Sequence, residues 1–77
     1  MSPRAPRVTA REIIRVIERR GFVRTRSSGS HHIYKNATGQ RVTVPVHAQK
    51  TLHPKVLQSI LRDMELTVQD LIDELRK

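Results

Sequence analysis

Apolar residues recur at helical spacing near the start of the chain, with charged residues between them. The apolar positions are Ile13, Ile14, Val16 and Ile17. Thr9-Ala10-Arg11-Glu12 matches a capping box, in which a threonine caps the helix and a glutamate three residues later reaches back. Gly21 suits the left-handed conformation that ends many helices. The pattern predicts a helix over residues 10–20 with its apolar stripe in the core.

The spacing then changes to that of strands. Residues 22–26 contain β-branched and aromatic residues that favour a first strand. Residues 27–30 predict a turn, and residues 31–36 predict a second strand. Residues 36–39 end in glycine and predict a hairpin turn. In a third strand over residues 40–46, valines alternate with polar residues. We therefore expect an antiparallel sheet that is covered on one face only.

The last part of the chain returns to helical spacing. Pro54 suits the first turn of a helix whose apolar positions continue to about residue 64. Thr67 can cap a short final helix. The order helix, three strands, helix, short helix predicts an α+β fold. We expect one domain over residues 9–77 and a flexible basic arm over residues 1–8.

Charge is distributed unevenly along the 77 residues, whose formal net charge is +8. Residues 1–62 carry 13 Lys and Arg against 2 acids, whereas residues 63–77 carry 2 against 5. A basic body of this kind is typical of proteins that bind a phosphate backbone, although a merely soluble basic protein has the same composition. The chain has no cysteine and no apolar run long enough for a signal peptide or a membrane span, which predicts a cytoplasmic protein without a membrane partner.

Two adjacent histidines, His31 and His32, follow a flexible run of serine and glycine over residues 27–30. Histidine is the side chain whose unperturbed pKa of about 6.5 lets it exchange protons near neutral pH. The pair is therefore a candidate for acid–base chemistry, with a surface pair of no function as the alternative.

The chain resembles the HicA family of bacterial toxins, which are small ribonucleases of toxin–antitoxin pairs. The resemblance runs from about Thr9 to Leu66. It rests on Arg-Gly-Phe at 20–22, Gly-Ser-His-His-Ile-Tyr at 29–34, Gly-Gln-Arg-Val-Thr-Val-Pro-Val-His at 39–47 and Leu-His-Pro-Lys-Val-Leu-Gln-Ser-Ile-Leu-Arg at 52–62. It implies a fold similar to double-stranded-RNA-binding domains, cleavage of messenger RNA by a histidine without metal or cofactor, and neutralisation by a HicB-type antitoxin.

The family's Gly-Ser-His motif falls on Gly29, Ser30 and His31, which implies that His31 is the catalytic residue. His32 is the alternative. Strand alternation puts His31 on the side of Ile33, the expected core side, and His32 on the side of Tyr34. If the strand begins at His32, His31 lies at the rim of the sheet and escapes burial.

Such a histidine can accept the proton of the 2′-hydroxyl that lies next to the scissile phosphate of RNA. Basic residues near it can stabilise the charge of the transition state and hold flanking phosphates. By sequence and strand pairing the candidates are Arg24, Arg26, Lys35 and Arg41, and Lys50 and Lys55 are candidates for backbone contacts. A module that binds structured RNA without cleaving it needs the same basic surface.

His47 is interpreted as a loop residue, with a place beside the RNA site as the alternative, and His53 is interpreted as a helix cap or a surface residue. The four histidines form no spacing typical of a closed metal site, so we expect no metal.

Overall fold

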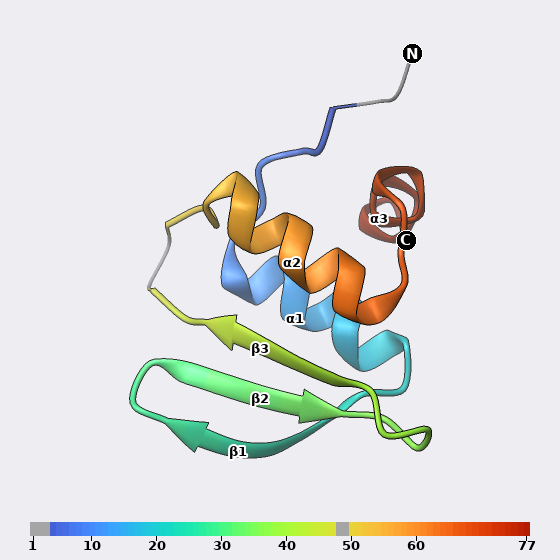
Figure 1. Ribbon diagram of the computed structural model, residues 1–77. Coiled ribbons are helices and arrows are strands. Elements are labelled where there is room, and N and C mark those ends of the chain that lie inside the picture. The colour runs from blue at the N-terminus through green and yellow to red at the C-terminus, as the bar shows by residue number, and fades with distance from the viewer. Residues whose placement is uncertain (1–3, 48–49) are drawn as a thin grey trace.

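The computed structural model describes residues 4–47 and 50–77 and has the predicted order of elements (Figure 1). The elements are α1 (Ala10–Arg19), β1 (Val23–Ser28), β2 (His31–Lys35), β3 (Arg41–Pro45), α2 (Pro54–Met64) and α3 (Val68–Leu75). Parts of the predicted basic arm and of the loop after residue 46 lie outside the described residues. No helix within the described ranges is long and apolar enough to cross a membrane.

The first helix begins at the predicted capping box. The Thr9 hydroxyl accepts the Glu12 backbone N–H at 3.2 Å, and the Glu12 carboxylate accepts the Thr9 backbone N–H at 2.9 Å. Helix α1 ends at Arg19, and Gly21 follows at φ 89°, where glycine has no steric penalty. A second capping box, between Thr67 and Asp70, starts α3.

The sheet is antiparallel with the order β1-β2-β3, so β2 lies in the centre. Strand β1 continues through Ser27 and Ser28, which pair with His32 and His31. The predicted turn over residues 27–30 is therefore wrong in its first half, because ladder pairing with β2 outweighs the weak strand propensity of serine. The turn itself is Gly29 and Ser30, with Gly29 at φ 58°.

Strand β1 contains an irregularity that the sequence did not predict. Arg24 pairs with Tyr34 and Arg26 pairs with Ile33, so Thr25 is an extra residue, a β-bulge. The Thr25 hydroxyl donates to the Ile33 carbonyl at 3.2 Å, which secures the bulge.

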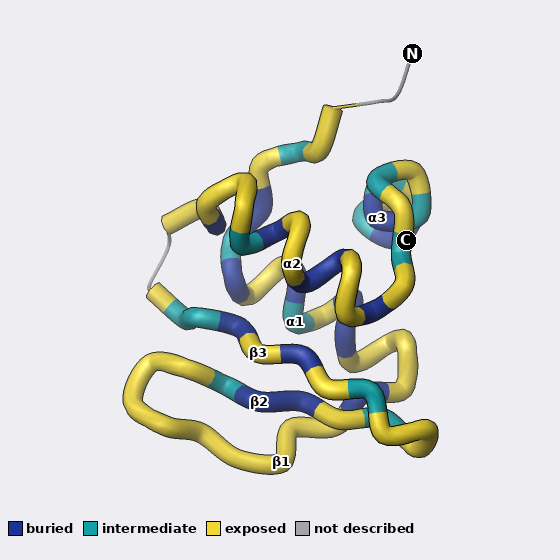
Figure 2. Tube along the Cα trace, in the orientation of Figure 1, coloured by how far each residue is buried: buried dark blue, intermediate teal, exposed yellow. Residues whose placement is uncertain are grey.

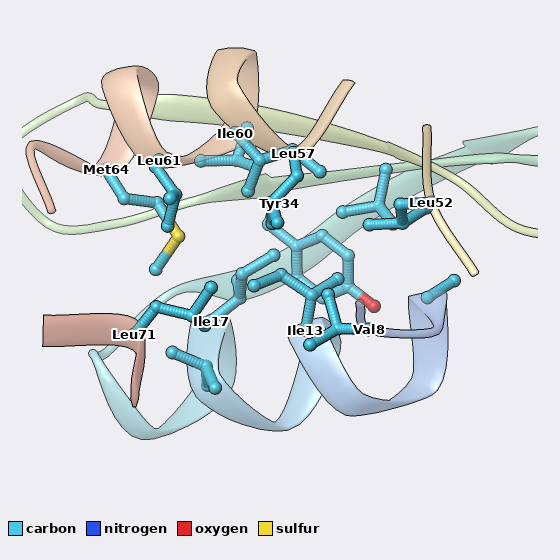
Figure 3. Packing of buried hydrophobic residues seen from close by; sticks show 14 of the residues in the cluster. Val8, Ile13, Ile17, Tyr34, Leu52, Leu57, Ile60, Leu61, Met64 and Leu71 are labelled. Atoms are coloured by element: carbon cyan, nitrogen blue, oxygen red, sulfur yellow. The ribbon is translucent and has the colours of Figure 1, made fainter. Parts of the chain in front are cut away.

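The helices cover one face of the sheet, and the hydrophobic core lies between the two layers (Figures 1 and 2). Tyr34, Val42 and Val44 project into this core, and Tyr34 is only 2% exposed. Figure 3 shows its ring packed among residues of α1 and α2, Ile13 and Leu57 among them. We call the uncovered side of the sheet the open face.

The expectation that Ile33 faces the core is wrong. Ile33 lies outside the core cluster, and since neighbouring residues of a strand point to opposite faces, it lies on the open face. The larger Tyr34, which pairs with Val42, takes the core side instead. Ile33 is nevertheless 9% exposed, because side chains of the open face surround it.

The packed structure begins one residue earlier than expected. Val8 is 1% exposed, and its carbonyl accepts the Leu52 backbone N–H at 2.7 Å. Val8 therefore belongs to the core and not to the basic arm.

Helix α3 is held to α1 by a buried carboxylate. Glu74 is 3% exposed and accepts hydrogen bonds from Arg19 Nε at 3.2 Å and Arg20 Nε at 2.8 Å. Arg19 also donates through Nη2 to the Glu74 carbonyl at 2.6 Å, and the Lys77 ammonium lies 3.5 Å from the carboxylate. Beside this ion pair, Leu71 is completely buried in the core. Burial raises the pKa of Glu74, but the hydrogen bonds from both arginines, with the charges of Lys77 and Arg20, outweigh it and lower the pKa below its ordinary value.

We predict that Glu74→Gln lowers the free energy of unfolding by about 1–2 kcal/mol at pH 7, because it removes charge-assisted hydrogen bonds to two half-exposed arginines. A carboxylate with a lowered pKa stabilises the fold above the unfolded value of about 4.3, and this contribution disappears as the pH falls through the lowered folded value. The difference between wild type and variant should therefore shrink on acidification.

Denaturant unfolding at pH 7 and pH 3 measures this difference. Asp63→Asn is the matched control, since it removes the same charge from an exposed position, and it should change the stability by less than about 0.5 kcal/mol. Equal destabilisation by Glu74→Gln at both pH values would contradict the assignment.

Candidate active site

His31 is the first residue of the central strand and is exposed. It pairs with Ser28 on one side and with Pro45 on the other. The neighbouring turn is tied to the end of β3, because the Val46 backbone N–H donates to the Ser30 carbonyl at 2.6 Å. His31 thus stands on the open face at the edge where β2 begins, held by backbone pairing on both sides.

His32 lies on the opposite face. It pairs with Ser27 and Val44, it shares the core side with Tyr34, and it is half-buried. Its Nδ1 atom is buried and has no hydrogen-bond partner among the described residues. The two adjacent histidines therefore have different environments, one accessible to a substrate and one turned toward the core.

Three of the predicted basic residues come together on the open face. Arg26, Lys35 and Arg41 line a hollow of about 210 Å³ together with Thr25 and Ile33. We call this the Ile33 hollow. Lys35 and Arg41 are register partners, and Arg26 pairs with Ile33 across the β1–β2 ladder. His31 lies two residues before Ile33 on the same face of β2, so it stands about 7 Å along the strand from the hollow.

Arg24 does not join this group. It pairs with Tyr34 and so belongs to the helix-facing side of the sheet, at its edge. Burial raises the pKa of the Tyr34 hydroxyl, the Glu18 carboxylate adds to this effect, and the Arg24 charge partly offsets it.

Lys50 and Lys55 do not line the Ile33 hollow. A second hollow of about 320 Å³ extends from Pro45, the partner of His31, and Lys50 contributes to its lining. The residues that line it are Pro45, His47, Lys50, Thr51, Leu52, His53 and Val56. Lys55 is exposed in the first turn of α2.

The other two histidines have the expected places. His47 is exposed after the end of β3. His53 is the N-cap of α2, and its Nδ1 accepts the Lys55 backbone N–H at 3.1 Å. Across residues 4–47 and 50–77, no three His, Asp or Glu side chains are grouped as metal ligands would be.

Two members of the Ile33 hollow were missed in the sequence. Thr25 reaches it because of the bulge, and Ile33 because Tyr34 takes the core side. The sequence of β1 carries no signal that predicts the β-bulge. The sequence does indicate which of Ile33 and Tyr34 faces the core, because Tyr34 pairs with Val42, one of the apolar positions of the third strand.

The fold is that of a small α+β domain similar to double-stranded-RNA-binding domains, with an exposed histidine beside basic residues on the open face. Its sequence matches the model of the HicA toxin of bacterial toxin–antitoxin systems over residues 10–66. The chain therefore belongs to the HicA toxin family, and it is the toxin component of a toxin–antitoxin system. A comparison with curated proteins found no match. Helix α3 lies beyond the matched residues.

The different environments of the two histidines predict that the same substitution stabilises the fold at one position and has little effect at the other. His32→Leu should raise the free energy of unfolding by about 1 kcal/mol, because it replaces a buried nitrogen without a partner by an apolar group. His31→Leu, at an exposed position, should change it by less than about 0.5 kcal/mol. Thermal denaturation of both variants measures the effect, and a clear destabilisation by His32→Leu would mean that the His32 ring is needed for packing.

Proposed function

We propose that this toxin is an endoribonuclease that cleaves messenger RNA without a metal ion, with His31 as its catalytic residue. The observation that carries the proposal is the position of His31, exposed on the open face at the start of the central strand and beside the cations of the Ile33 hollow. Messenger RNA as substrate implies that the toxin acts in the cytoplasm.

The chemistry uses the nucleophile that RNA itself carries. His31 accepts the proton of the 2′-hydroxyl, and the 2′-oxygen forms a bond to the adjacent phosphorus. The bond from phosphorus to the 5′-oxygen breaks, and the leaving oxygen takes a proton from water. The products are a 2′,3′-cyclic phosphate and a 5′-hydroxyl. General base catalysis of this kind contributes roughly 10²- to 10⁴-fold in rate.

His31 is favoured over His32 because a general base must lie within hydrogen-bonding reach of the proton that it removes. His32 is half-buried on the core side, and its Nδ1 atom is buried. His31 is exposed and fixed by its neighbours in the ladder.

The basic residues around His31 serve two purposes in this proposal. Lysine and arginine stabilise the extra negative charge of the pentacovalent transition state, and they hold the phosphates on either side of the cleaved bond. The proposed RNA-binding residues are Arg24, Arg26, Lys35, Arg41, Lys50 and Lys55. Of these, Arg24 has the weakest support, because it lies on the other side of the sheet.

The second candidate function is an RNA-binding module without catalysis. The similarity of the fold to double-stranded-RNA-binding domains and the basic surface both agree with it. Binding alone does not require an exposed histidine, so cleavage separates the two candidates.

We also propose that a HicB-type antitoxin neutralises this toxin by covering the open face. Arg26, Lys35 and Arg41 make this face basic, and a partner rich in Asp and Glu is attracted to such a face electrostatically. Helix α3 is acidic, but Glu74 is engaged with α1, so α3 does not do this work within the chain.

His31→Ala should abolish RNA cleavage and growth inhibition while the protein stays folded, since the base is lost from an exposed position. Gel analysis of a labelled messenger RNA fragment measures the cleavage, and mass spectrometry identifies the cyclic phosphate. Cleavage by the wild type should persist in EDTA.

His32→Ala is the matched control, because it removes the adjacent histidine, which shares the core side with Tyr34, and it should retain more cleavage activity than His31→Ala. Wild-type cleavage by His31→Ala would rule out the assigned role. Loss of activity in EDTA with rescue by a divalent ion would point to a metal mechanism.

Antitoxin binding should protect His31 from modification by diethyl pyrocarbonate, because the partner covers the open face. Peptide mapping of the free toxin and of the toxin–antitoxin complex measures the protection, with His47 as the internal reference. If His31 remains reactive in a complex that no longer binds RNA, neutralisation works through a different surface.

A further inference from the structure

We infer that single-stranded RNA crosses the open face along β2, with one nucleotide in the Ile33 hollow and the scissile phosphate at His31. This inference rests on the proposed function and adds to it the path of the substrate.

The register of the sheet places the relevant residues in successive rows on the open face. Ser28, His31 and Pro45 form the first row, Arg26, Ile33 and Thr43 the second, and Val23, Lys35 and Arg41 the third. Successive rows are about 7 Å apart along the strands. The catalytic row and the basic row are thus about 13 Å apart, and Ile33 lies between them.

This distance fits a short stretch of RNA. It corresponds to roughly two to four nucleotides, the larger number applying to bases stacked 3.4 Å apart. A strand that has its scissile phosphate at His31 then has its flanking phosphates near Lys35 and Arg41. The extended path matches the straight row of β2 positions.

The size and chemistry of the Ile33 hollow suit one nucleotide. Its volume of about 210 Å³ is below the range of roughly 300–1,000 Å³ that is usual for small-molecule pockets. Its lining combines an apolar side chain, Ile33, with the cations Arg26, Lys35 and Arg41 and the Thr25 side chain. The exposed part of Ile33 offers the base a small apolar contact, and the cations suit the adjoining phosphates.

The open face recognises bases without aromatic rings. The chain has two aromatic residues, Phe22 and Tyr34, and both are buried in the core. An arginine guanidinium group stacks on the base in their place, and the candidate is Arg26. Stacking of this kind tolerates every base, so the hollow should give affinity with little sequence preference.

The chemistry also favours a single strand. Attack by the 2′-oxygen requires this oxygen, the phosphorus and the leaving 5′-oxygen to lie in one line. A base-paired helix holds its backbone away from this arrangement, whereas a flexible strand on an open sheet can reach it. The turn between β1 and β2 consists of Gly29 and Ser30 and is too short to enter the groove of a duplex.

The test uses the full-length toxin in the His31→Ala background, so that bound RNA stays intact. The probes are a single-stranded RNA of about eight nucleotides and a duplex of about 16 base pairs, the length that a double-stranded-RNA-binding domain spans. The test variant adds Lys35→Ala and Arg41→Ala, which avoid the bulged strand β1. The control adds Arg62→Ala and Arg11→Ala, which remove the same charge from exposed positions on the helices.

We expect the single strand to bind more tightly than the duplex. A plot of log binding constant against log salt concentration has a slope of about −0.7 for each phosphate contact with a single strand. The test variant loses two such contacts, so the magnitude of its slope should be smaller by about 1.4. At 0.1 M salt this corresponds to roughly ten- to thirtyfold weaker binding. The control should keep the wild-type slope, and neither change should depend on base sequence.

Tighter binding of the duplex, or an unchanged slope in the test variant, overturns the inference even if the wild type cleaves RNA. A test variant that binds RNA normally but no longer captures the antitoxin also overturns it, because the open face then serves protein binding. If the slope falls as expected but wild-type toxin fails to cleave, the path on the open face stands and the proposed ribonuclease activity fails.

Discussion

The architecture depends on covering one face of the sheet and leaving the other uncovered. Residues of a strand alternate between the faces, so once Tyr34, Val42 and Val44 are committed to the core, the face of every other position in β2 and β3 is decided. This constraint separates His31 from His32 although they are adjacent in the sequence. A shift of register by one residue would bury His31 and expose the hydroxyphenyl ring of Tyr34, which is one of only two aromatic side chains in the core.

The last helix strengthens the same arrangement from outside the family-matched region. Leu71 extends the core, and Glu74 gathers the guanidinium groups of Arg19 and Arg20 at the end of α1. A chain of this size buries a smaller fraction of its surface on folding than a larger domain does, so one more helix with a charged anchor contributes substantially to its stability. The Glu74 carboxylate also neutralises part of the charge of Arg19 and Arg20 in the helical layer. The basic open face is therefore a surface separate from these two arginines.

Most of the fold was predictable because its signals are local. The capping boxes at Thr9 and Thr67, the proline at the start of α2 and the valine alternation in β3 each specify an element from a few neighbouring residues. What could not be predicted depends on partners that are distant in the sequence. Ser27 and Ser28 become part of a strand only through pairing with β2, and the bulge at Thr25 appears only when the register on both sides of it is known.

The candidate site was predictable to the same extent. The composition indicated a basic surface and the motif indicated His31, but the grouping of Arg26 with Lys35 and Arg41, and the exclusion of Arg24, follow from the register. The apolar character of Ile33 suggests the core, but its phase relative to the valines of β3 puts it on the open face. In a sheet with one buried face, the position of a residue in the strand alternation predicts its face better than its apolar character does.

The exposed strand β1 has a further consequence for the behaviour of the isolated toxin. It is an edge strand whose residues are all exposed, including Val23 at 67% (Figure 2). Edges of this kind invite pairing with a second chain, and natural proteins prevent it with bulges and charges. The bulge at Thr25, flanked by Arg24 and Arg26, supplies both devices. Arg26 therefore belongs both to the proposed RNA-binding surface and to the protected edge of the sheet, so a loss of toxicity on its replacement does not by itself separate impaired RNA binding from self-association.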